Sequence, residues 1–305
     1  MHYAQAFLPN LFILGAAKCG TTTLHAHLSR MTDVCMSQPK EPFFFEAEFA
    51  RGLGFYRQNY FSHWGGEPFL GDARHANLFL PWIPGRIAAM NPAAKLIVLV
   101  RDPVERAFSH WVHFRNAASE PLSFSEAIAE DWKRIKNGRR LTTPQEQEEH
   151  ARLLGPNELG HTGKGLYRTY IDRGYYAEQI ERYRQWFSVD QLKVYLFEEL
   201  ISCPEKIVND IVNFLQLDPQ YNRFEKDLWE NPANVPGWTR RLYEKLRLYR
   251  LAPEFSRRWA RRMIRRMRKS RTDRRIWDWL RDHFRIPNER LAELLGRDLS
   301  HWNQK

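Results

Sequence analysis

A short apolar run followed by a glycine-bounded turn and a row of threonines constrains the fold of this chain most strongly. The run Leu11–Leu14 has the length and apolar character of a buried strand, and residues 21–30 have the pattern of a helix. Between them, Gly15 and Gly20 bound a turn of small residues around Lys18. A strand, a tight turn and a helix in this order present unpaired backbone N–H groups to an anion. The sequence therefore predicts a phosphate-binding loop in an α/β fold.

Two further apolar runs predict the rest of a sheet. Residues 95–100 suit a strand buried on both faces, and residues 192–197 form a third strand. After it, Ser202 and Glu205 have the spacing of a capping box at a helix start. Longer helical patterns alternate with these runs and include residues 276–302. We therefore expect an α/β fold, a P-loop-like three-layer sandwich with a central parallel sheet flanked by helices.

The length and composition of the chain suit one domain. It has 305 residues, of which 43% are hydrophobic, enough to build one large core. We expect a single domain over residues 1–305. Within it, the polar segment 141–165 is predicted to be a surface loop or lid. Residues 237–275 are predicted to form a basic helical insertion.

The sequence lacks the features expected of an exported or membrane-spanning chain. No apolar run reaches the roughly 20 residues that cross a bilayer. The N-terminus lacks the basic and long apolar regions of a signal peptide. Cys19, Cys35 and Cys203 show no metal-ligand spacing and no complete disulfide framework. We therefore expect a cytoplasmic protein that needs no metal.

Positive charge is concentrated near the C-terminus. The net charge is +11, but 16 basic and only 3 acidic residues lie between Arg240 and Arg275. The rest of the chain then holds 31 basic and 33 acidic residues, a nearly neutral body. This distribution argues against nucleic acid as a partner.

The side chains of the glycine-bounded turn suit a phosphate. Lys18 supplies a positive charge, and Thr21 and Thr22 supply hydroxyl donors at the helix start. In a Walker A loop the lysine follows the second glycine, whereas Lys18 precedes Gly20. A P-loop nucleotide kinase is therefore the weaker interpretation.

The stretch 15–24, Gly-Ala-Ala-Lys-Cys-Gly-Thr-Thr-Thr-Leu, resembles the 5′-phosphosulfate-binding loop of sulfotransferases. These enzymes use 3′-phosphoadenosine 5′-phosphosulfate (PAPS) as the sulfuryl donor and release 3′-phosphoadenosine 5′-phosphate (PAP). The sequence looks most similar to the heparan sulfate and bacterial carbohydrate branch. The resemblance implies transfer to a hydroxyl, and we expect this transfer to need no metal because Lys18, Arg101 and the helix start supply the charge. It also implies that the donor is bound by Lys18, Cys19, Gly20, Thr21, Thr22 and Thr23.

A second phosphate motif follows the strand at 95–100. Arg101 stands at the carboxyl end of that strand, where ligands of open α/β sheets bind, and Ser109 lies eight residues later. This stretch resembles the 3′-phosphate motif of the same family. The resemblance implies that Arg101 and Ser109 hold the 3′-phosphate of PAPS.

Transfer to a hydroxyl needs a group that accepts its proton and a cation near the leaving oxygen. The string Lys-Glu-Pro-Phe-Phe-Phe-Glu at 40–46 resembles the family element that carries the catalytic base, at Glu41 here. Its aromatic neighbours are expected to raise the pKa of Glu41. Lys18 is the cation expected near the leaving oxygen. The alternative bases are His75 and His110.

The sequence departs from the family at residues 71–77. Many relatives carry a lysine in an acidic–Lys–Ser/Thr–Pro element there, and the aligned residue is Ala73. Arg74 or His75 is expected to compensate. Aromatic residues near Glu41, Trp82 and Trp111 suit either stacking on an acceptor or packing in a core.

The basic segment has a helical pattern of its own. Apolar residues recur every four positions from Phe255 to Met267, with arginines around them. Residues 255–271 are therefore predicted to form a basic amphipathic helix. We expect it to pack on the body, to dock on the inner face of an anionic membrane or to bind an acidic polysaccharide. The acceptor is expected to be a hydroxyl-bearing small molecule, glycan or lipid.

The sequence as a whole predicts a PAPS-dependent sulfotransferase. Glu41 is expected to act as general base and Lys18 to stabilise the leaving phosphate. The alternatives are a P-loop nucleotide kinase and a non-catalytic protein of the same fold that binds PAPS or a polyanion. The missing lysine at Ala73 favours the last of these, and Glu41 beside both phosphate motifs disfavours it.

Overall fold

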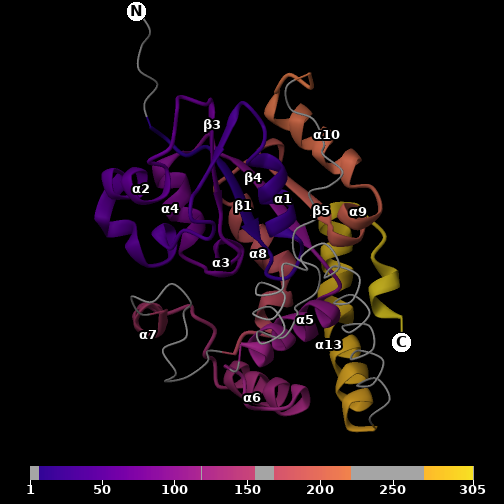
Figure 1. Ribbon diagram of the computed structural model, residues 1–305. Helices are drawn as coiled ribbons and strands as arrows, with labels where there is room; N and C mark the ends of the chain where they lie inside the picture. The colour runs from indigo at the N-terminus through magenta and orange to yellow at the C-terminus, as the bar shows by residue number, and fades with distance from the viewer. Residues whose placement is uncertain (1–6, 118, 155–167, 221–270, 305) are drawn as a thin grey trace, which may run out of the picture. The chain divides into compact units, whose positions relative to one another are not determined.

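The computed structural model describes residues 7–117, 119–154, 168–220 and 271–304 (Figure 1). The chain forms two compact units, and each is built from two separate segments. The first unit contains Met1–Arg101 and Glu178–Glu230, and the second contains Asp102–Ala177 and Asn231–Lys305. Whether they behave as the single domain expected from the sequence stays a prediction.

The first unit is built on a parallel five-stranded sheet with the strand order β2-β3-β1-β4-β5. Its strands are β1 (Leu11–Gly15), β2 (Val34–Met36), β3 (Phe69–Ala73), β4 (Lys95–Val100) and β5 (Leu192–Leu196). The sheet confirms the three strands that the sequence predicts. It adds β2 and β3, which the sequence analysis does not identify.

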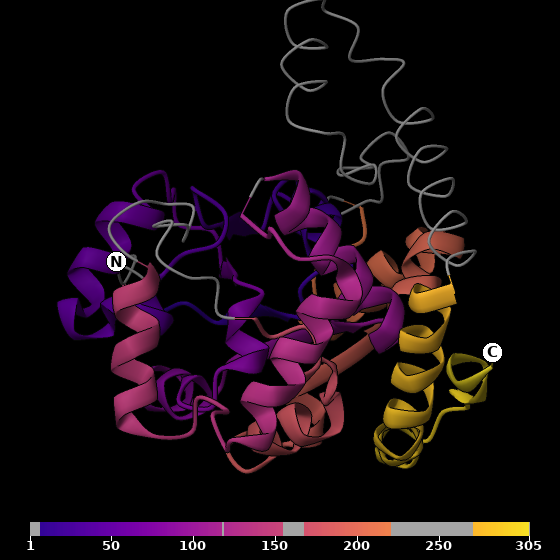
Figure 2. The same ribbon diagram turned by 90° about the horizontal axis from the view of Figure 1, so that it is seen from below.

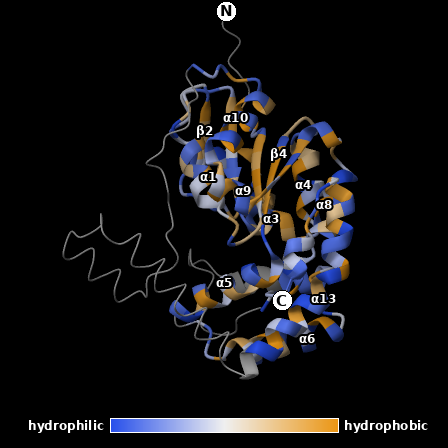
Figure 3. Cartoon of the chain, turned by 90° about the vertical axis from the view of Figure 1, so that its right-hand side faces the viewer, coloured by the Kyte–Doolittle hydropathy of each residue, from blue (hydrophilic) through white to orange (hydrophobic). Residues whose placement is uncertain are grey.

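The central strand β1 is buried along its whole length. Leu11 pairs with Gly71 on one side and with Lys95 on the other. The apolar residues of the sheet appear as orange strands in Figure 3. Because all pairings are parallel, the carboxyl ends of the strands meet at one edge of the sheet.

Helices cover both faces of this sheet. Figures 1 and 3 show α1 and α9 on one face and α4 and α8 on the other. This confirms the predicted three-layer α/β fold. The helices of the first unit are α1 (Thr21–Leu28), α2 (Gly52–Tyr60), α3 (Ala76–Phe79), α4 (Ile83–Met90), α9 (Phe197–Ser202) and α10 (Pro204–Leu215), together with most of α8 (Tyr176–Arg184).

Helix α10 buries the face that its apolar spacing predicts, Ile207, Val208, Ile211, Val212 and Leu215. The predicted capping box is wrong. Ser202 is the last residue of α9, and the residue that precedes α10 is Cys203, whose side chain makes no capping hydrogen bond. The predicted capping box fails because Ser202 belongs to α9 and does not cap α10.

The second unit is helical. Its helices are α5 (Pro103–Asn116), α6 (Phe124–Lys136), α7 (Pro144–Leu154) and α13 (Arg271–Leu295). Phe108, Trp111 and Phe124 from α5 and α6 share a buried core with Trp277 and Phe284 from α13. The 3-10 turn η5 (Ser300–Asn303) returns alongside α13, as the yellow segment in Figure 2 shows.

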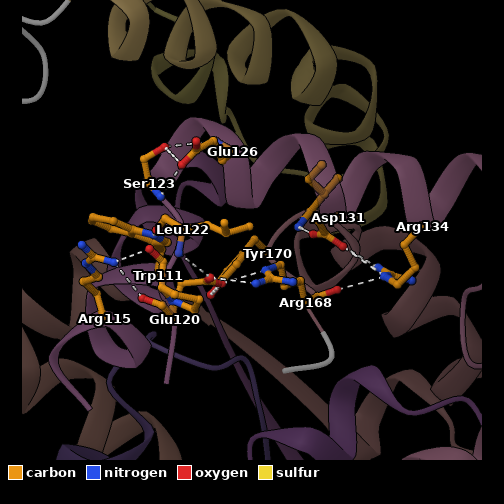
Figure 4. Close-up of polar contacts among 12 residues, drawn as sticks. Trp111, Arg115, Glu120, Leu122, Ser123, Glu126, Asp131, Arg134, Arg168 and Tyr170 are labelled. Carbon is orange, nitrogen blue, oxygen red and sulfur yellow. Dashed lines mark hydrogen bonds and ion pairs between the residues drawn. The ribbon is translucent and has the colours of Figure 1, made fainter. Parts of the chain in front are cut away.

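Buried ion pairs fasten residues 168–172 to this core (Figure 4). The Glu120 carboxylate accepts two hydrogen bonds from Arg168, both of 2.9 Å, and a third of 2.9 Å from the Tyr170 hydroxyl. Asp131 on α6 accepts the backbone N–H of Ile171 at 2.7 Å and pairs with Arg134. A buried charge with several partners holds its neighbours in one arrangement.

The segment 141–165 is not the continuous loop that its polar composition predicts. Residues 144–154 form α7, and the Glu146 carboxylate accepts the backbone N–H groups of Thr142 and Thr143 at its start. Its sequence, rich in Glu and Gln, lacks the apolar periodicity that usually reveals a helix. Residues 155–165 lie outside the described part, so the lid stays a prediction.

Most of the basic insertion at 237–275 also lies outside the described residues, and only residues 271–275 are seen, at the start of α13. The predicted helix at 255–271 falls in the same gap, apart from Arg271. Across the described ranges, no helix is both long and apolar enough to cross a membrane.

Candidate active site

The carboxyl ends of four neighbouring strands in the first unit carry the candidate site residues. Lys18 follows β1, Glu41 follows β2, His75 follows β3 and Arg101 follows β4. Of these four strands, the sequence reasoning predicts only β1 and β4. The structure adds β2 and β3, so Glu41 and His75 also stand at strand ends.

The turn after β1 has the backbone of an anion-binding loop. The Ala16 N–H donates to the Leu99 carbonyl of β4 at 2.6 Å, which fixes the start of the turn to the sheet. Lys18 has a φ of 68° and Gly20 a φ of 90° directly before α1. A Cβ atom on Gly20 would lie 2.7 Å from Leu200 Cδ2, so only glycine fits there without a shift. The helix start is thereby held against α9.

Lys18 lies among other positive charges. Burial lowers the pKa of its ammonium most, Arg101 and Lys40 lower it further, and Cys19 and Glu41 raise it only in part. The net effect lowers the pKa of Lys18 to about 8. A cation crowded by cations in a partly buried turn is stabilised by a bound anion. The residues therefore fit the phosphate-bearing donor that the sequence predicts.

The other predicted donor residues take different places. Cys19 is buried, with its thiol 3.6 Å from the Ala17 carbonyl oxygen. Thr21 and Thr23 are buried on α1, and Thr22 is partly exposed. Arg101 carries its guanidinium 4.7 Å from the centre of the Phe197 ring. Ser109 lies on α5 and belongs to the second unit, so its pairing with Arg101 stays a prediction.

Both carboxylate oxygens of Glu41 have partners. Oε2 accepts the His75 backbone N–H at 2.9 Å, lies 2.8 Å from His75 Nδ1 and lies 3.8 Å from Arg74. Oε1 pairs with the Lys40 ammonium. The Glu41 backbone N–H donates to the Ala73 carbonyl at 3.2 Å, which holds this segment against the end of β3.

The expectation of a raised pKa for Glu41 is wrong. Burial does raise the pKa of this carboxyl, but His75, Lys40 and Arg74 together hold it well below its usual range. Of the neighbouring aromatic residues, Phe44 and Phe45 turn into the core, where Phe44 stacks on Tyr56 with ring centres 4.0 Å apart. The cations thus outweigh the aromatics in setting the pKa of Glu41.

Both residues expected to compensate for the missing lysine contact Glu41. Ala73 itself is buried in β3. Arg74 lies over the Phe43 ring, 4.0 Å from its centre, and donates two hydrogen bonds to the buried Glu46 carboxylate. His75 makes the closer contact with Glu41. Positive charge therefore remains beside Glu41 without the lysine.

His110, Trp111 and Trp82 are the remaining histidine and aromatic candidates. His110, the alternative base, is buried on α5 of the second unit between Phe114 and Tyr170. Trp111 is in the core of the same unit, whereas Trp82 is partly exposed. Within the described ranges, no three His, Cys, Asp or Glu residues gather as a metal site would require.

The sequence reasoning missed a buried carboxyl beneath the site. Asp72 in β3 accepts a hydrogen bond from the Tyr56 hydroxyl and another, of 3.3 Å, from the Asn77 amide. Burial raises the pKa of Asp72 to about 7; Tyr56 opposes this shift and Glu41 adds to it. The acidic residue directly before Ala73 was the available signal, but without β3 its burial could not be inferred.

Comparison with known proteins agrees with this geometry. The family model described as "Sulfotransferase domain" matches residues 8–230. A crystal structure of a sulfotransferase from Alicyclobacillus acidocaldarius is 27% identical, covers 98% of this chain and 100% of that chain, and superposes with a TM-score of 0.65.

Two curated relatives are longer proteins. The membrane-associated sulfotransferase kil1 of Dictyostelium discoideum is 22% identical over 97% of this chain and 67% of its own length. The bifunctional heparan sulfate N-deacetylase/N-sulfotransferase 4 of Mus musculus is 28% identical over 72% of this chain. The match spans only 23% of the mouse enzyme. With the family match and the fold, these similarities establish that the chain belongs to the sulfotransferase family, a family of sulfuryl-transferring enzymes.

Proposed function

We propose that the protein transfers the sulfuryl group of PAPS to a hydroxyl of a carbohydrate or carbohydrate-bearing acceptor. The observation that carries this proposal is the cluster of Lys18, Lys40 and Arg101 around the turn after β1, beside the carboxylate of Glu41. Such a cluster offers an anionic donor several cations and offers the acceptor proton a basic pair nearby.

Two phosphate sites explain why the donor is PAPS rather than ATP. In the proposal, the 5′-phosphosulfate lies in the turn formed by Lys18, Cys19, Gly20, Thr21, Thr22 and Thr23. Arg101 and Ser109 hold the 3′-phosphate. The cations and the start of α1 supply the charge that the donor needs, so no metal is required.

The reaction is an in-line displacement at sulfur. The acceptor oxygen forms a bond to sulfur while the bond from sulfur to the 5′-phosphate oxygen breaks. The leaving phosphate oxygen keeps the electron pair and is stabilised by Lys18. The acceptor proton passes to the pair formed by Glu41 and His75, of which Glu41 is the base that the sequence predicts.

The acceptor class is inferred from relatives. The name of the mouse relative includes heparan sulfate N-sulfotransferase activity, which supports a glycan acceptor. A hydroxyl-bearing lipid or small molecule remains within the proposal. The proposed donor site does not restrict which of these acceptors is used.

Titration calorimetry with PAP in the absence of Mg²⁺ tests the donor site. We expect tight binding by the wild type, at least a 100-fold loss in Arg101→Ala, about 3 kcal/mol in binding free energy, and little change in Glu41→Gln. Absence of PAP binding, or equal affinity for ATP, would overturn the proposal and favour a nucleotide kinase.

Contact with an anionic membrane surface is a separate proposal for residues 255–271, which lie outside the described part except for Arg271. The Dictyostelium relative is named as membrane-associated, and the segment is strongly basic. In this proposal the protein works in the cytoplasm, at the inner face of the membrane. Sedimentation with vesicles containing phosphatidylserine tests it, and absence of binding at low salt refutes it.

A further inference from the structure

Four partly exposed aromatic rings lie together in the second unit, where α6 packs against α13 (Figures 1 and 3). Trp132 comes from α6, Trp279 and His283 come from α13, and Tyr175 directly precedes α8. We call these four side chains the aromatic cluster. Trp132, Trp279 and Tyr175 pack against the buried core of the unit and form a layer outside it.

The rings of the aromatic cluster contact one another. Trp279 stacks on His283, with ring centres 5.0 Å apart and planes 15° apart. Trp132 stands steeply against both, at 67° to Trp279 and 74° to His283, with ring centres 5.4 and 4.9 Å away. The Tyr175 hydroxyl lies 2.6 Å from His283 Nε2, which holds the imidazole in place. The rings therefore present surfaces in two directions and not one flat layer.

Both indoles of the aromatic cluster keep a hydrogen-bond donor. Among the residues that the structure describes, no group accepts a hydrogen bond from the indole N–H of Trp132 or Trp279. By contrast, Trp111 in the neighbouring core donates its N–H to the Leu122 carbonyl at 3.1 Å. Aliphatic side chains would be sufficient to seal the core. Partly exposed indoles with available N–H groups suit a ligand that has both apolar and polar surface.

Positive charge borders the aromatic cluster. The ammonium of the exposed Lys136 lies 5.5 Å from the centre of the Trp132 ring. The Arg140 guanidinium lies 5.1 Å from the centre of the Tyr175 ring and 3.6 Å from the buried Asp172 carboxylate, so only part of its charge is available to a ligand. Burial lowers the pKa of His283, so at neutral pH its imidazole is uncharged. Lys136 and Arg140 therefore supply the charge of this surface.

The outer rim on α13 carries one charge of each sign. Arg275 lies four positions before Trp279 and Asp282 three positions after it, so both are neighbours of Trp279 on the helix surface. Both side chains are exposed. Because these opposite charges offset each other, the surface as a whole stays positive.

We propose that the aromatic cluster binds an acidic oligosaccharide. The C–H face of a sugar ring packs on the indoles, its hydroxyls accept hydrogen bonds from the indole N–H groups, and its carboxylate or sulfate groups pair with Lys136 and Arg140. An acidic peptide offers the same charges but lacks the rigid ring that matches the indoles. This binding site belongs to the second unit and does not depend on the proposed sulfuryl transfer.

The first experiment is NMR of the full chain labelled with ¹⁵N-tryptophan and titrated with a heparin hexasaccharide. The indole signals are assigned by their loss in Trp132→Phe, Trp279→Phe and Trp111→Phe. We expect the Trp132 and Trp279 signals to shift and the Trp111 signal to shift much less. The two shifts report binding at this site even if the basic residues between 240 and 275 bind the same hexasaccharide. Unchanged Trp132 and Trp279 signals would overturn the inference.

Variants at exposed positions test the role of charge without disturbing the core. We expect Lys136→Gln to weaken binding, measured from the two indole signals, by about 3- to 10-fold. Asp282→Asn removes a repulsive charge and should tighten binding by about 2-fold. Lys206→Gln, at an exposed lysine on α10 of the first unit, is the matched control and should leave binding unchanged. Equal binding by Lys136→Gln and the control, or weaker binding by Asp282→Asn, contradicts the proposal.

Two further ligands separate the sugar from its charge. Cellohexaose has sugar rings without charge, and hexaglutamate has carboxylates without sugar rings. We expect each to bind at least about 10-fold more weakly than the heparin hexasaccharide. Equal binding of hexaglutamate would identify a surface for acidic peptides, and equal binding of cellohexaose would remove the role of charge, so either result refutes the inference. PAP titration of the wild type decides the proposed function separately, and its failure would leave this site unaffected.

Discussion

At the scale of single residues, Lys18 shows a conflict between stability and the proposed function. Burial and neighbouring cations lower the pKa of its ammonium from 10.5 to about 8. Between these pH values the unfolded chain binds more protons than the folded one, so stability rises with pH. Below both pKa values, the charged form of Lys18 lowers the free energy of unfolding.

Lys18→Met should therefore stabilise the free protein while removing PAP binding. We expect a gain of about 1–3 kcal/mol in the free energy of unfolding at pH 7 and a loss of the rise in stability between pH 8 and 10. Urea unfolding at several pH values measures both. Lys206→Met, an exposed change on α10, is the control and should alter stability by less than about 0.5 kcal/mol. A destabilised Lys18→Met would contradict this account.

At the scale of elements, Gly20 joins the start of α1 to α9. Its φ of 90° strains any other residue, and a Cβ atom there would lie 2.7 Å from Leu200. Gly66 has a φ of 108° but no atom within 4 Å of an added Cβ. We expect Gly66→Ala to lower the free energy of unfolding by about 1 kcal/mol. Gly20→Ala should lower it by about 2 kcal/mol more than Gly66→Ala does. Equal losses in urea unfolding would show that α9 does not restrict this turn.

The buried ion pairs of the second unit offer a matched test of burial. Glu120 is fully buried with three side-chain hydrogen bonds, whereas Glu126 forms an exposed capping box with Ser123 (Figure 4). We expect Glu120→Gln to cost about 3 kcal/mol, because it leaves Arg168 without its charge partner. Glu126→Gln should cost less than about 1 kcal/mol. Thermal unfolding of both variants measures these two losses of stability. Similar losses in the two variants would refute a dominant role for burial.

The same elements show what could be predicted from the sequence. Strands β1 and β4 are apolar runs buried on both faces, and their pattern is sufficient to identify them. Strand β3 contains Gly71 and Asp72, which depress strand propensity. Gly71 is there because a Cβ atom would lie 2.2 Å from the sulfur of Met36 on β2, a constraint visible only once the strands are paired.

The residues of the candidate site divide in the same way, into those that follow predicted strands and those that follow unpredicted ones. Lys18 and Arg101 follow the two readily predicted strands, and their positions at the sheet edge are as expected. Glu41 and His75 follow β2 and β3, so their 2.8 Å contact had no signal in the sequence. The low pKa of Glu41 could not be predicted, because it depends on Arg74 and His75 at the end of β3 as well as on the adjacent Lys40. Local patterns locate the strands, whereas electrostatics depends on the assembled sheet.

At the scale of the whole molecule, the two units raise the question of cooperativity. The family match ends at residue 230, yet α13 places Trp277, Leu280 and Phe284 in the core of the second unit. Each unit is assembled from two segments separated by residues of the other, and the chain passes between them three times. Neither unit is a continuous piece of chain, and the single domain expected from the sequence stays a prediction.

We therefore expect Phe284→Ala to weaken both units together. A fully buried phenylalanine replaced by alanine costs about 3–5 kcal/mol, and this loss should appear in the hydrogen exchange of β1 and β4 as well as α5 and α6. PAP binding should in turn slow exchange in the second unit. If Phe284→Ala accelerates exchange only in α5, α6 and α13, and PAP protects only the sheet, the units unfold independently. The chain would then contain two domains, with the strand-end cations in one and Ser109 in the other.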